Sequence, residues 1–271
     1  MKIFLSIFIF IISSLSADIL TSKIENLIDS ANYQKHKNLI DNITQERKLF
    51  YYNDKQLNYN ILLNVLRKNG LLNLRYNKPK EVKIEFIIEQ NPLLSMKIIK
   101  DVLRNLGYSY YFTDYLRYNN GILNWQIVFK SEYMLDPYIF NNELRQNEMK
   151  IVDITKISKT VWRYKFNSTN AKLQDAIKVQ KDEKIKFLKP LKPYLIRVDN
   201  PKEIKIVSRK LNHWFAKLTL YTKDLKLLGS IKKRRIYRGI RLKLPEDTYY
   251  ILIDDSYTLL NIKRGLTIIV K

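Results

Sequence analysis

The chain of 271 residues contains no cysteine, two histidines and only six glycines. Without cysteine there is no disulfide, no thiolate nucleophile, no zinc–thiolate site and no attachment point for an N-terminal lipid. Six glycines leave no glycine-rich phosphate loop. His36 and His213 have no His or Glu neighbour at zinc-hydrolase spacing, and we interpret His213, beside Trp214, as structural. We therefore expect a protein that is not an enzyme and that uses no metal and no cofactor.

Long apolar runs are also missing beyond the first residues of the chain. Lys2 precedes a mainly apolar run, Ile3–Ile12, and small residues follow up to Ala17. This order is typical of a secretory signal peptide, and the run is too short for a membrane-spanning helix, which needs about 20 residues. We expect residues 1–17 to be a signal peptide and the product to be periplasmic or secreted. An uncleaved anchor and a buried first helix are the alternatives.

Acidic residues are scarce, and the formal net charge is +23. Residues 172–271 contain 25 Lys and Arg against 10 Asp and Glu, whereas residues 80–170 contain 13 against 10. In the cytoplasm such asymmetry would indicate nucleic acid, but outside it the available polyanions are lipid head groups, wall polymers and acidic protein faces. We expect an envelope protein complex, or an anionic envelope polymer or membrane surface, as partner and no nucleic acid. Mutational drift toward Lys is the competing explanation.

The periodicity of apolar residues predicts an α+β, multidomain chain. Residues 18–79 form a helical segment, in which we expect three short antiparallel helices, the third capped by Asn53 or Asp54. Residues 80–170 predict the order β-α-β-β-α-β with one added strand. That order is typical of a ferredoxin-like (split βαβ) domain.

Three local signals define this middle domain. Asn119-Asn120-Gly121 predicts a hairpin turn, because Asn and Gly tolerate positive φ. A helix is expected after Ser95 and closed by Gly107, and Asp136-Pro137 should cap and open the second helix.

Residues 171–192 predict a basic linker in which the spacing favours a helix near 171–179. Residues 193–271 then contain short alternating segments with breaks that include Gly229. They predict an antiparallel, basic β-sandwich. The expected strands are Tyr194–Val198, Glu203–Val207, Trp214–Tyr221, Ile236–Leu244, Tyr249–Asp254 and Leu266–Val270.

Two stretches of this region carry a resemblance. Residues 218–229 (LTLYTKDLKLLG) and 244–253 (LPEDTYYILI) resemble the accessory β-sandwich modules of secreted bacterial proteins, with Asp247 where glycine is usual. The resemblance implies a module that binds rather than catalyses. The organisation of the whole chain is similar in style to secreted or periplasmic proteins of unknown function from epsilonproteobacteria.

The candidate binding site is a basic, tyrosine-containing stretch that we expect to form one hairpin. Alternation would put Lys233, Arg235 and Tyr237 on one strand face, where Arg can bind phosphate or carboxylate. A solvated hairpin tip is the alternative. The stretch consists of Lys232, Lys233, Arg234, Arg235, Tyr237, Arg238 and Arg241.

A second candidate is the aromatic sheet face from Tyr108 to Trp125, including Tyr110 and Tyr115, which could stack on glycans or form core. Ser230 and Lys233 have Ser-x-x-Lys spacing but lack the partner motifs. Glu246-Asp247 and Asp254-Asp255 could bind calcium or act in glycoside hydrolysis, although turns favour Asp for local reasons.

The sequence therefore predicts an exported, non-enzymatic accessory protein that binds its partner through the basic β-sandwich. The alternative is a peptidoglycan- or glycan-binding protein, and an envelope hydrolase is third. The oligomeric state does not follow from the sequence.

Cleavage is the first testable expectation. N-terminal sequencing of the protein from an envelope fraction should start at Ala17 or Asp18, because the small residues end there. A mature protein that keeps Met1 would contradict the signal peptide.

Overall fold

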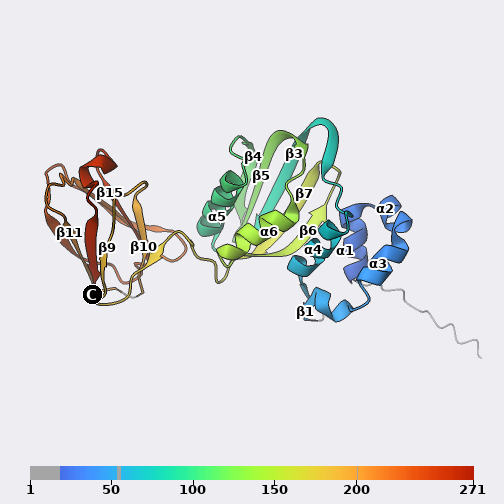
Figure 1. The fold of residues 1–271 in the computed structure, drawn as a ribbon, viewed down its shortest axis with the longest axis horizontal. Coiled ribbons are helices and arrows are strands. Elements are labelled where there is room, and N and C mark those ends of the chain that lie inside the picture. Colours follow the sequence, from blue (N-terminus) through green and yellow to red (C-terminus); the bar gives the residue numbers. More distant parts are fainter. Residues whose placement is uncertain (1–18, 54–55, 200) are drawn as a thin grey trace, which may run out of the picture. The chain divides into compact units, whose positions relative to one another are not determined.

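The computed structural model describes residues 19–53, 56–199 and 201–271. The chain divides into two compact units, one ending at Leu74 and the other beginning at Arg75. Helices and sheets both occur, so the chain has a mixed α+β fold (Figure 1). The expected signal peptide, residues 1–17, lies outside the described residues. Within the described part, no helix is both long and apolar enough to cross a membrane.

The first unit is mainly helical, with four α-helices in its described residues where three were expected. Asn53 lies in a strand of a short antiparallel pair and does not cap the last helix. Asn58 caps it instead, because its side chain accepts a hydrogen bond from the Ile61 N–H at 3.4 Å. The elements are α1 (Ile19–Ile28), α2 (Ser30–Lys35), α3 (Lys37–Ile43), η1 (Arg47–Phe50), β1 (Tyr51–Asn53), β2 (Gln56–Leu57) and α4 (Tyr59–Lys68).

The second unit begins with a five-stranded sheet and two helices, which we call the mixed-sheet region (residues 75–167). Its strand order is β4-β5-β3-β7-β6, and β7 runs parallel to β3 while the other neighbours are antiparallel. The element order is the predicted one, with β7 as the added strand between β3 and β6. The elements are β3 (Arg75–Ile88), α5 (Pro92–Asn105), β4 (Phe112–Asn119), β5 (Ile122–Tyr133), α6 (Pro137–Gln146), β6 (Lys150–Lys156) and β7 (Val161–Asn167).

Helices α5 and α6 lie on one face of this sheet (Figure 1). Strand alternation directs every second residue of β3 toward them, and Phe86 is the centre of the aromatic core. Its ring centroid lies 5.2 Å from that of Trp125 and 6.1 Å from that of Phe140. Burial of these large side chains stabilises the sheet–helix packing.

The local signals of this region are confirmed, with one shift. Gly107 (φ 88°) and Gly121 (φ 80°) have the positive φ that a helix end and a hairpin turn require. Asp136 caps α6, accepting from the Tyr138 N–H at 2.9 Å. Helix α5 begins at Pro92 rather than after Ser95, which lies buried within the helix.

The rest of the unit forms two sheets, which we call the two-sheet region (residues 177–271). One sheet has the order β13-β12-β15-β10-β8 and the other β14-β11-β16-β9, and side chains from both form one apolar core. The strands are β8 (Ile177–Lys178), β9 (Lys184–Lys186), β10 (Tyr194–Arg197), β11 (Glu203–Ser208), β12 (Ala216–Tyr221), β13 (Leu227–Lys232), β14 (Gly239–Lys243), β15 (Tyr250–Asp255) and β16 (Leu266–Val270).

Three expectations for this region are wrong. Residues 171–179 form no helix, and the segment expected to be a linker contributes β8 and β9 to the two sheets. The backbone groups of the segment are satisfied across strands, as when the Val179 N–H donates to the Arg197 carbonyl at 2.9 Å. Gly229 does not break the chain but lies inside β13.

Gly121 and Gly265 have nearly the same positive φ but different surroundings, so substitutions at the two positions distinguish backbone strain from steric contact. A Cβ on Gly121 (φ +80°) would have no neighbour within 4 Å, whereas one on Gly265 (φ +81°) would lie 1.9 Å from the Phe187 carbonyl oxygen. We expect Gly121→Ala to lower the free energy of unfolding by about 1–2 kcal/mol and Gly265→Ala to lower it further. Urea unfolding of both variants measures this, and equal losses would contradict the tight approach at Gly265.

Candidate functional site

The basic stretch expected to be a hairpin connects the two sheets instead. Strand β13 pairs with β12 in one sheet and β14 pairs with β11 in the other, so β13 and β14 are not partners. Residues 233–238 are the connection, and alternation does not place Lys233, Arg235 and Tyr237 on a common strand face. Turn signals mark where the chain bends, but strand pairing depends on the rest of the core. We call residues 232–241 the basic crossover.

Backbone hydrogen bonds hold the basic crossover along its length. The Lys233 N–H donates to the Ala216 carbonyl at 2.8 Å, and the Tyr237 N–H donates to the Trp214 carbonyl at 2.8 Å. Trp214 is fully buried, so the crossover is anchored to the core of the two-sheet region. Its side chains are therefore displayed from an ordered backbone.

The cations of the basic crossover differ in their environment. Lys233 is half-buried with its amine 5.7 Å from the centre of the Tyr237 ring, and Arg241 forms an ion pair with Glu203 at 3.1 Å. The remaining four are exposed and have no ion-pair partner among the described residues. These four are Lys232, Arg234, Arg235 and Arg238.

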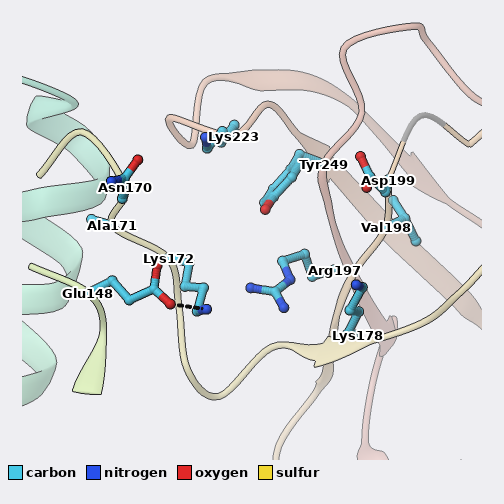
Figure 2. A pocket seen from close by; sticks show the side chains of 10 residues that line it. All are labelled: Glu148, Asn170, Ala171, Lys172, Lys178, Arg197, Val198, Asp199, Lys223 and Tyr249. Atoms are coloured by element: carbon cyan, nitrogen blue, oxygen red, sulfur yellow. Dashed lines mark hydrogen bonds and ion pairs between the residues drawn. The ribbon is translucent and has the colours of Figure 1, made fainter. Parts of the chain in front are cut away.

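A second group of cations lines a cavity of about 310 Å³, which we call the cation cavity (Figure 2). Its cations come from the segment after β7, from β8, from β10 and from the turn after β12, and Tyr249 lies among them. The charged lining residues are Lys172, Lys178, Arg197, Lys223, Glu148 and Asp199.

Sequence reasoning missed the cation cavity. Lys178 and Arg197 are not neighbours in sequence, and they come together because β8 pairs with β10 in parallel register. The only available signal was the excess of Lys and Arg after residue 171, which gives no position.

The aromatic candidates of the mixed-sheet region divide into core and surface. Trp125 is 1% exposed and its indole N–H donates to the Thr113 hydroxyl at 3.1 Å, so the expectation that it could stack on a glycan is wrong. Trp125 is the register partner of Phe86, so both side chains lie on the helix-covered face of the sheet. Tyr110, Phe112 and Tyr118 are exposed, at 95%, 79% and 60%.

Tyr115 belongs to a polar network on the other face of the sheet. Its hydroxyl donates to Glu85 at 2.6 Å, and the Arg163 Nε–H donates to the second Glu85 oxygen at 2.6 Å. Glu85 is only 7% exposed, and these two bonds compensate its burial. Burial, followed by the Glu85 hydrogen bond, raises the pKa of Tyr115 to about 12. The arrangement is a structural one, because both carboxylate oxygens are engaged.

Of the acidic candidates, Asp254 and Asp255 are engaged in local structure, whereas Glu246 and Asp247 are exposed. The Asp255 carboxylate accepts hydrogen bonds from the N–H groups of Phe215, Tyr257 and Thr258 and from the Asn261 amide, at 2.8–3.0 Å. Asp254 pairs with Lys217 at 3.2 Å.

The remaining candidates do not assemble into a site. The Ser230 hydroxyl donates to the Leu218 carbonyl at 3.3 Å, and His213 is exposed. Among the described residues, no group of three or more His, Asp or Glu is placed to hold a metal ion.

Comparison with known proteins gives no information about the function of this chain. No protein-family model matches the chain, and a search of curated proteins finds no match. Among solved structures, a β-glucosidase from Paenibacillus barengoltzii matches at 15% identity with a TM-score of 0.21. The match covers 35% of this chain and 11% of the β-glucosidase, and a likeness of this size carries no argument about function.

The Tyr115 hydroxyl provides a test of the polar network. Because its pKa is raised above that of an unfolded tyrosine (about 10), the neutral form is favoured in the fold. Its stabilising contribution is present below pH 10 and is lost as pH rises through 12. In a spectrophotometric titration, Tyr115→Phe should remove one tyrosine from those that ionise only near pH 12. Loss of a tyrosine that ionises near pH 10 would contradict the network.

Proposed function

We propose that this is an exported, non-enzymatic accessory protein that binds an anionic partner of the cell envelope through its two-sheet region. In this proposal the two-sheet region is a β-sandwich and the mixed-sheet region is a split βαβ domain with one inserted strand. The expected signal peptide supports the export, and the polyanions outside the cytoplasm define the class of partner.

One observation carries the binding proposal, namely the exposed cations of the basic crossover. Lys232, Arg234, Arg235 and Arg238 lie close in sequence on a backbone tied to the core, and no described acidic residue forms an ion pair with them. Like charges held together repel, so such a cluster costs stability unless an anion approaches it. A cluster that existed only for solubility would not need an ordered backbone.

The type of cation also favours recognition of an anion. Three of these four residues are Arg, whose planar guanidinium binds phosphate or carboxylate with two parallel hydrogen bonds. Lysine is far more common than arginine elsewhere in the two-sheet region, so the Arg-rich composition of the crossover differs from the general Lys excess. Compositional drift toward Lys does not account for it.

A glycan-binding function is the second candidate. Tyr110, Phe112 and Tyr118 are exposed at or next to β4, which is the edge strand of its sheet. Exposed aromatic rings can stack on sugars, and this mode of binding depends little on salt. The two candidates therefore differ in a measurable property.

The decisive experiment is co-sedimentation with purified peptidoglycan sacculi and with phosphatidylglycerol vesicles at increasing salt. Exposed charges are screened beyond about 8 Å at physiological ionic strength, so binding through the crossover should weaken steeply. The double variant Arg234→Glu with Arg235→Glu should reduce low-salt binding at least about tenfold. The free energy of unfolding should change by no more than about 1 kcal/mol, because exposed charges contribute little to stability.

The matched control is Lys35→Glu with Lys48→Glu, which makes the same charge change at exposed residues of the first unit. This control should bind like the parent. Equal loss in both double variants would show that only net charge matters, and unchanged binding in the crossover variant would contradict the proposed surface. Salt-independent binding that is lost in Tyr110→Ala with Tyr118→Ala would favour the glycan candidate.

A further inference from the structure

The cation cavity contains two like charges that the fold places side by side. Arg197 of β10 is the register partner of Lys178 on β8. Register partners on neighbouring strands point to the same face, and the strands lie about 4.8 Å apart. Like charges in direct cross-strand positions are destabilising. Neither side chain has an ion-pair partner among the described residues, so the repulsion between them is uncompensated within the fold.

Backbone hydrogen bonds fix this placement. The Val179 N–H donates to the Arg197 carbonyl, and the Val198 N–H donates to the Tyr249 carbonyl, both at 2.9 Å. Val179 and Val198 are each 1% exposed, which anchors the backbone on either side of the two cations. Core packing therefore fixes the backbone positions from which the two cations extend.

A third cation reaches the cavity from the turn after β12. Lys223 lies in a turn where the Thr222 hydroxyl accepts from the Lys226 N–H at 2.9 Å. Lys226 is paired with Asp224 at 3.0 Å, whereas Lys223 has no ion-pair partner within the described part of the chain. Asp224, the one carboxylate of the turn, thus pairs with Lys226, and Lys223 remains able to bind an anion in the cavity.

The carboxylates of the cavity do not balance these cations. Glu148 is paired with Lys172, as the dashed line in Figure 2 marks. Asp199 is the other acidic lining residue, and it is exposed. Lys178, Arg197 and Lys223 therefore face one unengaged carboxylate, which leaves a net positive cavity.

Tyr249 adds an aromatic surface to the lining of the cation cavity. Its N–H donates to the Tyr221 carbonyl at 2.8 Å, and its ring packs edge-on against Tyr250 with centroids 4.9 Å apart. The ring of Tyr249 and the guanidinium of Arg197 both extend from the two-sheet region into the lined space (Figure 2). An anion held by the cations would lie beside an aromatic ring.

We propose that the cation cavity binds a phosphate monoester. A guanidinium with neighbouring ammonium groups is the donor set that suits a dianionic phosphate. The volume of about 310 Å³ is at the small end of ligand pockets, which run from about 300 to 1,000 Å³, and leaves room for a sugar-sized group on Tyr249. The cavity shares no residue with the basic crossover, so this proposal does not depend on the proposed function.

The test is isothermal titration calorimetry of the whole chain with glucose 6-phosphate, inorganic phosphate and glucose. The cavity variant is Lys178→Gln with Arg197→Gln, and the control is Lys35→Gln with Lys48→Gln, which removes the same charge from exposed residues of the first unit. Loss of hydrogen bonds to a charged ligand should weaken binding of glucose 6-phosphate roughly ten- to a hundredfold in the cavity variant. The control should bind within about twofold of the parent.

Thermal unfolding measurements show whether the cavity variant still folds. Without ligand, the cavity variant should melt at or above the melting temperature of the parent, because it removes a like-charge pair. Glucose 6-phosphate should raise the melting temperature of the parent and the control but not of the cavity variant, since a ligand that binds only the folded state stabilises it.

A further arm identifies the source of the phosphate. Vesicles containing phosphatidic acid, which is also a phosphate monoester, should bind through the same residues if the natural ligand is a lipid head group. Weaker binding of either probe by the cavity variant, with unchanged binding by the control, supports the site. The proposal is overturned if the parent binds neither probe, or if the cavity and control variants lose binding equally. Inorganic phosphate binding as tightly as glucose 6-phosphate overturns the role given to Tyr249.

Discussion

The pairing of β8 with β10 is the constraint on which the second half of the molecule depends. This short parallel contact joins the segment after the mixed-sheet region to the sheet that contains β15 and β12. It closes one edge of that sheet and buries Val179 in the shared core. The same contact places Lys178 beside Arg197. A single backbone pairing thus stabilises the fold through the core and concentrates positive charge at its surface.

The distribution of acidic residues explains why the positive charge is left over. The buried or half-buried carboxylates are used inside the structure, as Asp255 is in organising the turn after β15 and Glu85 in joining Tyr115 to Arg163. Others neutralise one particular cation, as Glu203 does for Arg241. These acids of the basic chain are therefore engaged locally. The unpaired cations of the basic crossover and of the cation cavity lie in the same half of the chain as the charge excess.

The two cationic surfaces suit different ligands for a physical reason. The basic crossover is exposed, with several Arg side chains in water. Salt limits the distance over which its charge attracts an anion. The cation cavity combines a half-buried guanidinium with an aromatic ring. An extended polyanion can use the first, whereas the second has the size for one small group.

Local chemistry made much of the fold predictable from the sequence. Asn120-Gly121 determined its turn, because both residues accept positive φ, and Asp136-Pro137 determined the start of α6. The absence of cysteine excluded a class of sites, and the uneven charge indicated the half of the chain that contains the basic crossover and the cation cavity.

Only the tertiary structure decided which strands are partners. The sequence of residues 232–241 is equally compatible with a hairpin and with a crossover, because the turn signal is the same and the choice depends on the sheet that each strand completes. Residues 171–192 read as a linker because β8 and β9 are too short to produce a periodic pattern. Lys178 and Arg197 meet through that pairing alone. Long-range register, which no local pattern encodes, therefore determined the candidate sites.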